Sequence, residues 1–162
     1  MEGNFTINVK DGKQYKISKN AILLSEMLKD MKEVPEEFPI PVETDSKTFD
    51  KITEYFAHFN GNMPQEIQKP ILSHDIKKAT DEWSANFIDK LTVEELVNLT
   101  ITANLMKINS LLNLCCAKMV TLCKGKTQDE IFKLFGVSSN YFTPEKIEQI
   151  KENNKWVDDI FQ

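Results

Sequence analysis

The sequence predicts an α/β (α+β) fold, with strands and helices mixed in the first half and helices alone in the second half. Apolar Phe5, Ile7 and Val9 alternate with polar residues, which is the two-residue period of a strand with one buried face. From about residue 83 onward, apolar residues recur at the spacing of amphipathic helices instead. The 162 residues suffice for one domain with a short extension.

The opening of the chain predicts a hairpin followed by a helix. Asp11-Gly12 is a turn signal, and Tyr15 and Ile17 then alternate as the return strand. Ser18 is placed to cap the helix, because its hydroxyl can accept a hydrogen bond from a free amide of the first turn. The apolar positions of this helix are Leu24, Met27, Leu28 and Met31.

A third strand and a second helix follow. Residues 38–42 alternate, but Pro39 and Pro41 occupy the other phase, and proline cannot donate to a ladder. We therefore expect this strand to be short and to lie at an edge. Asp45 begins the helix and Gly61 ends it. Its apolar face consists of Phe49, Ile52, Phe56 and Phe59.

The middle of the chain predicts a linker. Residues 62–80 contain Pro64 and Pro70 and show no sustained period, so we expect a flexible segment. A short helix around Trp83 follows it and begins the helical half.

The next two helices carry two apolar stripes each. Thr92 and Glu95 form a capping box, in which each side chain can bond the backbone amide of the other residue. The helix that follows has one stripe at Leu96, Leu99, Ala103 and Met106, and another at Val97, Ile101 and Leu105. The helix over about 109–124 has stripes at Leu111, Cys115 and Leu122, and at Leu112, Cys116, Met119 and Cys123. A second stripe needs neighbouring helices or another protein to cover it, and the pattern leaves both interpretations open.

Two further helices are predicted near the end. Thr127 and Glu130 form a second capping box, and Gly136 stops the helix. Thr143 and Pro144 begin the last helix, with proline at the first helical position. Apolar residues expected to face inward there are Ile147, Ile150 and Val157.

The composition excludes several function classes. A net charge of −5 argues against nucleic acid and anionic membrane as partners. Met1-Glu2 lacks the basic start of a signal peptide, and no apolar run is long enough for a bilayer, so we expect a cytoplasmic and nuclear protein. Cys115, Cys116 and Cys123 are then free thiols. Neighbouring cysteines on a helix point about 100° apart, which excludes a shared metal.

No arrangement of residues suggests catalysis. Nucleophile motifs and glycine-rich phosphate loops are absent. His58 and His74 lack a catalytic partner, and a thiol enzyme using Cys116 is disfavoured because no basic residue accompanies that mid-helix thiol. We therefore expect no enzyme activity, no cofactor and no metal.

Four segments of the chain match known signature sequences. Residues 98–113 (NLTITANLMKINSLLN) are similar to ILAANYLDIKGLLD, and residues 124–131 (KGKTQDEI) are similar to KGKTPEEI, so the chain resembles the Skp family, which carries these signatures. Residues 142–145 (FTPE) and 154–156 (NKW) continue the match. The resemblance covers essentially the whole chain, with departures such as Leu105, where the family usually has Tyr, that mark a divergent member.

The resemblance implies an adaptor subunit of an SCF (Skp–cullin–F-box) ubiquitin ligase, which acts in protein degradation. It implies a BTB/POZ domain over residues 1–124 and a C-terminal helical F-box-binding extension over residues 125–162. The F-box-binding positions it implies are Val97, Thr100, Ile101, Leu112, Cys116, Met119, Ile131, Phe135 and Trp156. The implied cullin-binding positions are Asn104 and Leu105. Pro144 becomes a candidate for modification, because several protist members hydroxylate and then glycosylate the matching proline.

Other interpretations stay open beside this one. Leu105 removes an aromatic ring and a hydroxyl from the implied cullin contact, so the alternative is a divergent Skp-like structural or self-associating scaffold that has lost cullin binding. An oligomerisation module of a transcription regulator is disfavoured, since no DNA-binding or repeat region accompanies the domain. The sequence leaves open which F-box proteins are bound and whether the free protein forms a homodimer.

Overall fold

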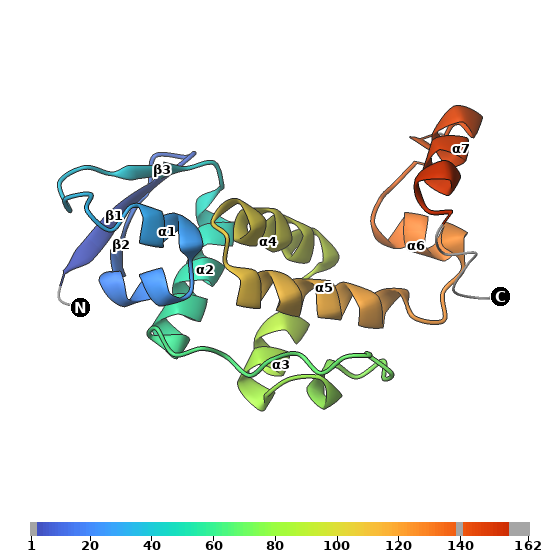
Figure 1. Ribbon diagram of the computed structural model, residues 1–162, viewed down its shortest axis with the longest axis horizontal. Coiled ribbons are helices and arrows are strands. Elements are labelled where there is room, and N and C mark those ends of the chain that lie inside the picture. The colour runs from blue at the N-terminus through green and yellow to red at the C-terminus, as the bar shows by residue number, and fades with distance from the viewer. Residues whose placement is uncertain (1–2, 139–140, 156–162) are drawn as a thin grey trace. The chain divides into compact units, whose positions relative to one another are not determined.

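The computed structural model describes residues 3–138 and 141–155, which belong to two compact units (Figure 1). The first unit, Met1–Lys124, combines a small sheet with helices, and the second unit, Gly125–Gln162, is helical in its described part. This arrangement confirms the predicted α+β class with a helical C-terminal part. It is consistent with the BTB/POZ fold that the resemblance implies.

The sheet is built from β1 (Asn4–Val9), β2 (Gln14–Ser18) and β3 (Ile40–Val42), in the order β2-β1-β3. β1 runs antiparallel to β2 and parallel to β3. The predicted alternation is confirmed, because the apolar side chains of β1 are buried while Thr6 and Asn8 are only partly covered. β3, which contains Pro41 and follows Pro39, is short and lies at an edge, as expected.

The helix predicted from Ser18 is interrupted, and this prediction was wrong. The structure has a 3₁₀ turn, η1 (Lys19–Leu23), and a separate helix, α1 (Glu26–Asp30). Ser18 caps the first element, as predicted, but Ser25 caps the second by accepting a hydrogen bond from the amide of Leu28 at 3.2 Å. A cap requires a non-helical backbone at Ser25, and this breaks the helix.

α2 (Ser46–Phe59) begins and ends where the sequence predicts. The carboxylate of Asp45 caps its first turn by accepting a hydrogen bond from the amide of Thr48 at 2.8 Å. Asn60 and Gly61 end it in the left-handed region, with φ of +44° and +87°. The predicted apolar face of α2 is buried in the core of the first unit.

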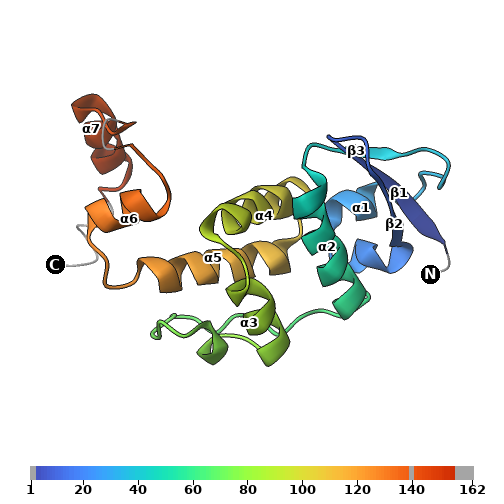
Figure 2. The ribbon, with the colours of Figure 1, turned by 180° about the vertical axis from the view of Figure 1, so that it is seen from behind.

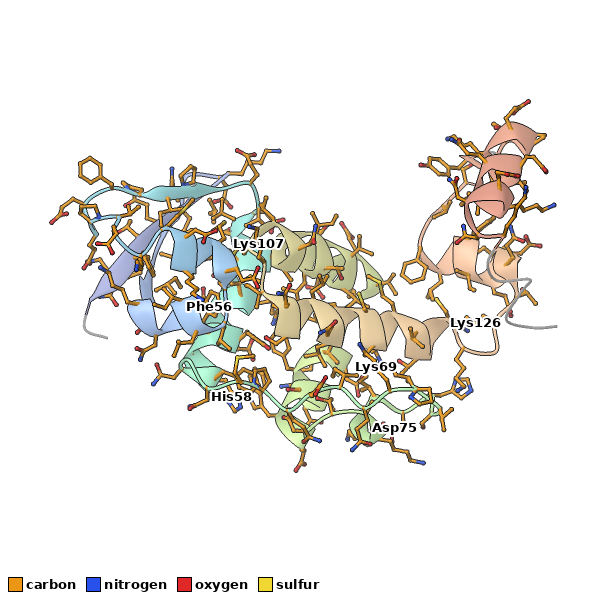
Figure 3. All side chains as sticks on the ribbon, in the orientation of Figure 1. Phe56, His58, Lys69, Asp75, Lys107 and Lys126 are labelled. Carbon is orange, nitrogen blue, oxygen red and sulfur yellow. The ribbon has the colours of Figure 1, made fainter. Side chains whose placement is uncertain are left out.

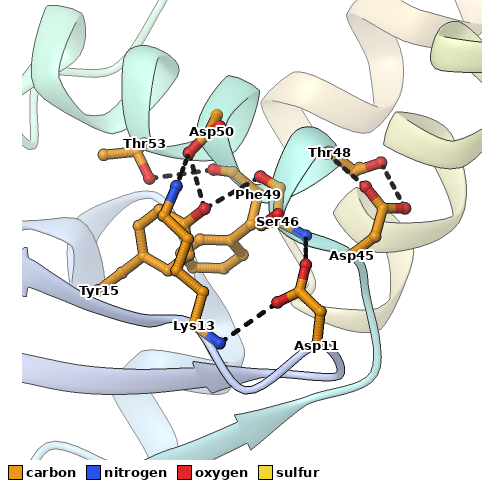
Figure 4. Close-up of polar contacts among 9 residues, drawn as sticks. All are labelled: Asp11, Lys13, Tyr15, Asp45, Ser46, Thr48, Phe49, Asp50 and Thr53. Atoms are coloured by element: carbon orange, nitrogen blue, oxygen red, sulfur yellow. Dashed lines mark hydrogen bonds and ion pairs between the residues drawn. The ribbon is translucent and has the colours of Figure 1, made fainter.

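Polar contacts fix the hairpin turn to the start of α2 (Figure 4). The carboxylate of Asp11 accepts hydrogen bonds from the amides of Lys13 at 3.3 Å and Ser46 at 2.9 Å. Hydrogen bonding by Ser46 holds the pKa of Asp11 below its usual value. Beside it, Asp50 accepts from the Tyr15 hydroxyl at 2.6 Å and from the Lys13 ammonium at 3.0 Å. The hairpin and the helix therefore form one rigid corner.

Three helices complete the first unit: α3 (Glu82–Asp89), α4 (Val93–Leu105) and α5 (Asn109–Cys123). α4 and α5 pack as a helical hairpin, and α3 lies against α5 (Figure 1). Lys107 makes the turn between α4 and α5 with φ of +51°, and Met106 beside it is fully buried. The capping box predicted at the start of α4 is confirmed by both of its hydrogen bonds.

An aromatic cluster joins α2 to α3. The Tyr55 and Phe59 rings of α2 lie next to Trp83 and Phe87 of α3, with Trp83 and Phe87 stacked at 5.0 Å between centroids. The imidazole of His58, labelled in Figure 3, stacks on Trp83 at 3.7 Å with the two rings nearly parallel. His58 is thus an exposed part of a structural ring stack.

The linker over residues 62–80 has an irregular backbone that contacts the core at several points. Ile67 is buried, and a short 3₁₀ turn, η2 (Ile76–Lys78), inserts another isoleucine into the core. At its middle, the ammonium of Lys124 donates to the carbonyl of Ile71 at 3.2 Å and to the following carbonyl at 2.5 Å. The flexibility expected of this linker stays a prediction.

The second unit contains α6 (Gln128–Leu134) and α7 (Pro144–Asn153). The capping box of Thr127 and the threonine cap of α7 are both present, as predicted. Ile147 and Ile150 were expected to face inward, but they are 38% and 47% exposed. Val157 lies outside the described residues. None of the described residues of this unit is buried, since a segment this short cannot enclose a core.

Candidate partner-binding surfaces

α4 exposes the second apolar stripe that the sequence predicts. Ile101 is 61% exposed and Leu105 is 45% exposed, while Val97 is half-buried. These residues are spaced by four, so they form one row along the helix. The first stripe is buried against the core, as expected. On α4, one apolar row therefore packs against the core, and the other row is exposed and open to another protein.

Thr100 lies at the junction of α4 with α5. Its hydroxyl donates a 2.6 Å hydrogen bond to the carbonyl of Leu96 within the helix. Burial raises the pKa of the neighbouring Cys115 thiol to about 12, and a hydrogen bond with Thr100 opposes this rise. Thr100 is half-buried, so only part of its side chain is available to a partner.

α5 continues the surface with Leu112, Cys116 and Met119. Cys116 is exposed, and Leu112 and Met119 are half-buried and pack against the core. Val120 is 47% exposed and was not singled out from the sequence. Its position four residues after Cys116 could have placed it on the same face.

Asn104 and Leu105 are both exposed at the C-terminal end of α4, at the turn that Lys107 makes (Figure 3). The turn is held from outside, because the hydroxyl of Ser25 donates a 2.7 Å hydrogen bond to the carbonyl of Met106. The amide at the start of α1 also donates to the carbonyl of Lys107 at 3.2 Å. The turn next to Asn104 and Leu105, the predicted cullin-binding pair, is therefore held in place by hydrogen bonds.

The remaining predicted positions belong to the second unit. Ile131 and Phe135 are half-buried and spaced by four, which places them on one face of the α6 segment. Pro144 is exposed at the first position of α7, directly after its cap. Trp156, the last predicted F-box-binding residue, lies outside the described residues.

Residues 3–138 and 141–155 contain no group of three or more His, Cys, Asp or Glu side chains that could hold a metal ion. Within the same ranges, no helix is long and apolar enough to span a bilayer.

Comparison with known proteins identifies relatives of the whole chain. A family model described as "Skp1 family, dimerisation domain" matches residues 109–157. The chain is 38% identical over 143 residues to the S-phase kinase-associated protein 1 homolog of Tetrahymena thermophila, covering 88% of the chain and 84% of that protein. It is 32% identical over 143 residues to the E3 ubiquitin ligase complex SCF subunit sconC of Arthroderma otae, covering 88% and 85%. A subunit of the same name from Talaromyces marneffei is 29% identical over 163 residues, covering 98% and 99%.

These relatives extend across both compact units. The matched lengths show that the chain spans most of each relative, so the likeness is not confined to one motif. The resemblance found in residues 98–113 and 124–131 is thereby confirmed at the level of the family. The chain belongs to the Skp1 family.

Proposed function

We propose that the chain is the adaptor subunit of an SCF-type E3 ubiquitin ligase, linking F-box proteins to a cullin, with no catalytic step of its own. The observation that carries this proposal is the uncovered apolar surface of α4 and α5, with Ile101 61% exposed, in a chain whose relatives are named SCF subunits. A contiguous apolar surface on a small protein usually marks an interface. An adaptor needs such surfaces and needs no reactive groups.

The F-box surface that we propose combines the exposed row of α4 with Leu112, Cys116 and Met119 of α5. These side chains are apolar or weakly polar, and a partner helix could cover them by contacts at helical spacing. Burial of apolar area would supply most of the binding free energy. Ile131 and Phe135 of the second unit are proposed to contact the same partner.

The cullin surface that we propose centres on Asn104 and Leu105. Leu105 offers an apolar contact and Asn104 offers an amide that can donate and accept. Because the turn is already held by Ser25, docking there costs little conformational entropy. We propose that the complex acts in both cytoplasm and nucleus.

The proposal for the second unit follows from the exposure of its described residues, 125–138 and 141–155, none of which is buried. Helices as short as α6 and α7 are marginal alone, and partner contacts would stabilise them. The exposed Ile147 and Ile150 are available for such contacts.

Affinity purification of the tagged chain from its native cells tests the function. We expect an F-box protein and a cullin to be recovered together and in stoichiometric amounts. Recovery of F-box proteins without a cullin would favour the self-associating or structural alternative, for which the loss of an aromatic residue at Leu105 is the supporting observation. Recovery of neither partner would contradict the adaptor function.

A further inference from the structure

A cavity of about 350 Å³ lies between α5 and the linker. Its lining is mostly apolar and comes from two segments far apart in the sequence. The linker contributes Ile67, Lys69, Pro70 and Ile71, and α5 contributes Asn113, Cys116, Ala117 and Val120. In Figures 1 and 2, the linker runs past α5 on the side away from α4. Figure 3 labels Lys69 on this linker wall.

The cavity is continuous with the proposed F-box surface. A helix turns about 100° per residue, so Cys116 points to the middle of the exposed face of α5. Leu112 and Met119 lie on one flank of Cys116, while Asn113 and Val120 lie on the other. Cys116 therefore belongs both to the proposed F-box surface and to the lining of the cavity. A partner that covers Cys116 therefore also lies next to the cavity.

The linker wall is already held in place in the free chain. The ammonium of Lys124 donates to the carbonyl of Ile71 at 3.2 Å, which fixes the linker against the end of α5. On the other side, Ile67 is buried and the amide of Gln68 donates to the carbonyl of Ala79 at 3.0 Å. A preformed wall lowers the entropy cost of inserting a side chain from a partner.

We propose that this cavity is an additional contact site for the F-box protein and receives one apolar side chain from it. The inference rests on the proposed adaptor function and adds the linker to the surface that recognises the F-box. Lys69 stands beside the apolar lining, so an acidic residue next to the inserted side chain fits the site best. The residues of the linker that line the cavity would then help to determine which F-box proteins bind.

The test uses the full chain and the F-box protein that co-purifies with it. Ile71→Asp and Val120→Asp place a carboxylate in the cavity, and each is expected to weaken binding at least about tenfold, because the partner would bury that carboxylate against its own apolar side chain and acidic neighbour. Leu72→Asp is the matched control, since Leu72 is the next residue, is 77% exposed and does not line the cavity. Its affinity is expected to stay within about twofold of the parent chain.

The outcomes separate this inference from the adaptor function. If the parent chain binds the F-box protein and both cavity variants bind it equally well, the cavity is not contacted and the inference is overturned. If the cavity variants change only the self-association measured by sedimentation, the occupant is a second copy and the inference is also overturned. If the parent chain binds no F-box protein, the adaptor function itself fails. Val120→Asp decides the matter if Ile71→Asp does not fold, because Val120 is 47% exposed.

Discussion

The hydroxyl of Ser25 donates a 2.7 Å hydrogen bond to the carbonyl oxygen of Met106, joining residues that are 81 positions apart. The hydroxyl oxygen of Ser25 also accepts a hydrogen bond from the amide of Leu28 and thereby caps α1. One buried side chain thus begins a helix and supports the turn that carries Asn104 and Leu105.

Replacement of Ser25 by alanine should therefore remove two interactions at once. We expect Ser25→Ala to lower the free energy of unfolding by about 1–3 kcal/mol, because α1 loses its cap and the Met106 carbonyl loses a partner. Urea denaturation measures the change. Ser18→Ala, which removes the solvent-exposed cap of η1, is the control and should cost less than half as much. Equal losses in the two variants would contradict the dual role of Ser25.

Glu95 should make the stability of the first unit depend on pH. Its carboxylate accepts a 2.9 Å hydrogen bond from the amide of Thr92 and lies 2.9 Å from the Lys47 ammonium. These contacts, led by Thr92, lower the pKa of Glu95 from 4.5 to about 2. A carboxyl with a lower pKa in the folded state stabilises the fold above its unfolded pKa, and this contribution is lost as the pH falls through the folded pKa.

Glu95→Gln should accordingly be less stable than the parent chain at pH 7, by no more than about 1 kcal/mol because the site is near solvent. The difference should close as the pH falls from 4.5 toward about 2. Denaturation at a series of pH values measures it. Glu94→Gln removes a neighbouring exposed carboxyl and is the control. A difference that stays constant with pH would show that the carboxyl charge is not involved.

The two partner surfaces should be separable by mutation. Asn104→Lys combined with Leu105→Lys should abolish cullin binding and leave F-box binding within a few-fold. Met119→Asp should do the reverse, weakening F-box binding by about 10²-fold or more, because a carboxylate would be buried in an apolar contact. Phe135→Asp should weaken F-box binding in the same direction. Pull-downs against a purified cullin N-terminal domain and an F-box protein measure both affinities.

The same experiment also separates surface from core residues. If every variant lost both partners, these residues would be supporting the fold instead of contacting partners. If the unmutated chain bound no cullin, this result would indicate that Leu105 does not replace the contact of the family's usual Tyr, and it would favour the structural alternative.

The second unit should gain protection from hydrogen exchange when an F-box protein binds. We expect the amides of residues 128–153 to exchange rapidly in the free chain, because α6 and α7 are short and bury no residue among those described. Exchange in the presence of an F-box peptide should slow there, while the buried amides of α4 act as an internal reference. Strong and equal protection with and without the peptide would contradict this expectation.

Pro144 should be accessible to a modifying enzyme. It is exposed at the first turn of α7. An amide at this position would have no partner within the helix, so the missing N–H of proline costs no hydrogen bond there. The mass of the native protein decides whether hydroxylation and glycosylation occur. A Pro144→Ala variant, with its folding checked by circular dichroism, controls for modification elsewhere. An unmodified peptide spanning residues 134–151 would end the hypothesis.

Local sequence signals predicted the features that depend on neighbours along the chain. The strand alternation at Phe5, the capping box at Thr92 and the proline start at Pro144 each involve residues within a few positions, and each is present. The exposed row of α4 was also visible, since its period is that of the helix. The family signature supplied the expected roles of these residues, which their spacing alone did not.

Features that depend on distant residues were not predictable from the pattern. The break at Ser25 depends on a carbonyl from the α4–α5 turn, which no local signal indicates. The exposure of Ile147 was missed because an amphipathic pattern shows which face is apolar and not whether anything covers it. The cavity beside Val120 was missed because the linker has no period from which its position could be deduced.

Every residue that the structure describes as buried precedes Lys124, and this has a practical consequence for protein engineering. The tail from Gly125 can be treated as an interchangeable module, because none of its described side chains belongs to the core. Grafting the tail of a relative onto residues 1–124 should give a hybrid that melts at nearly the temperature of the parent chain. Such hybrids would allow partner preference to be redesigned without a new search for a foldable scaffold.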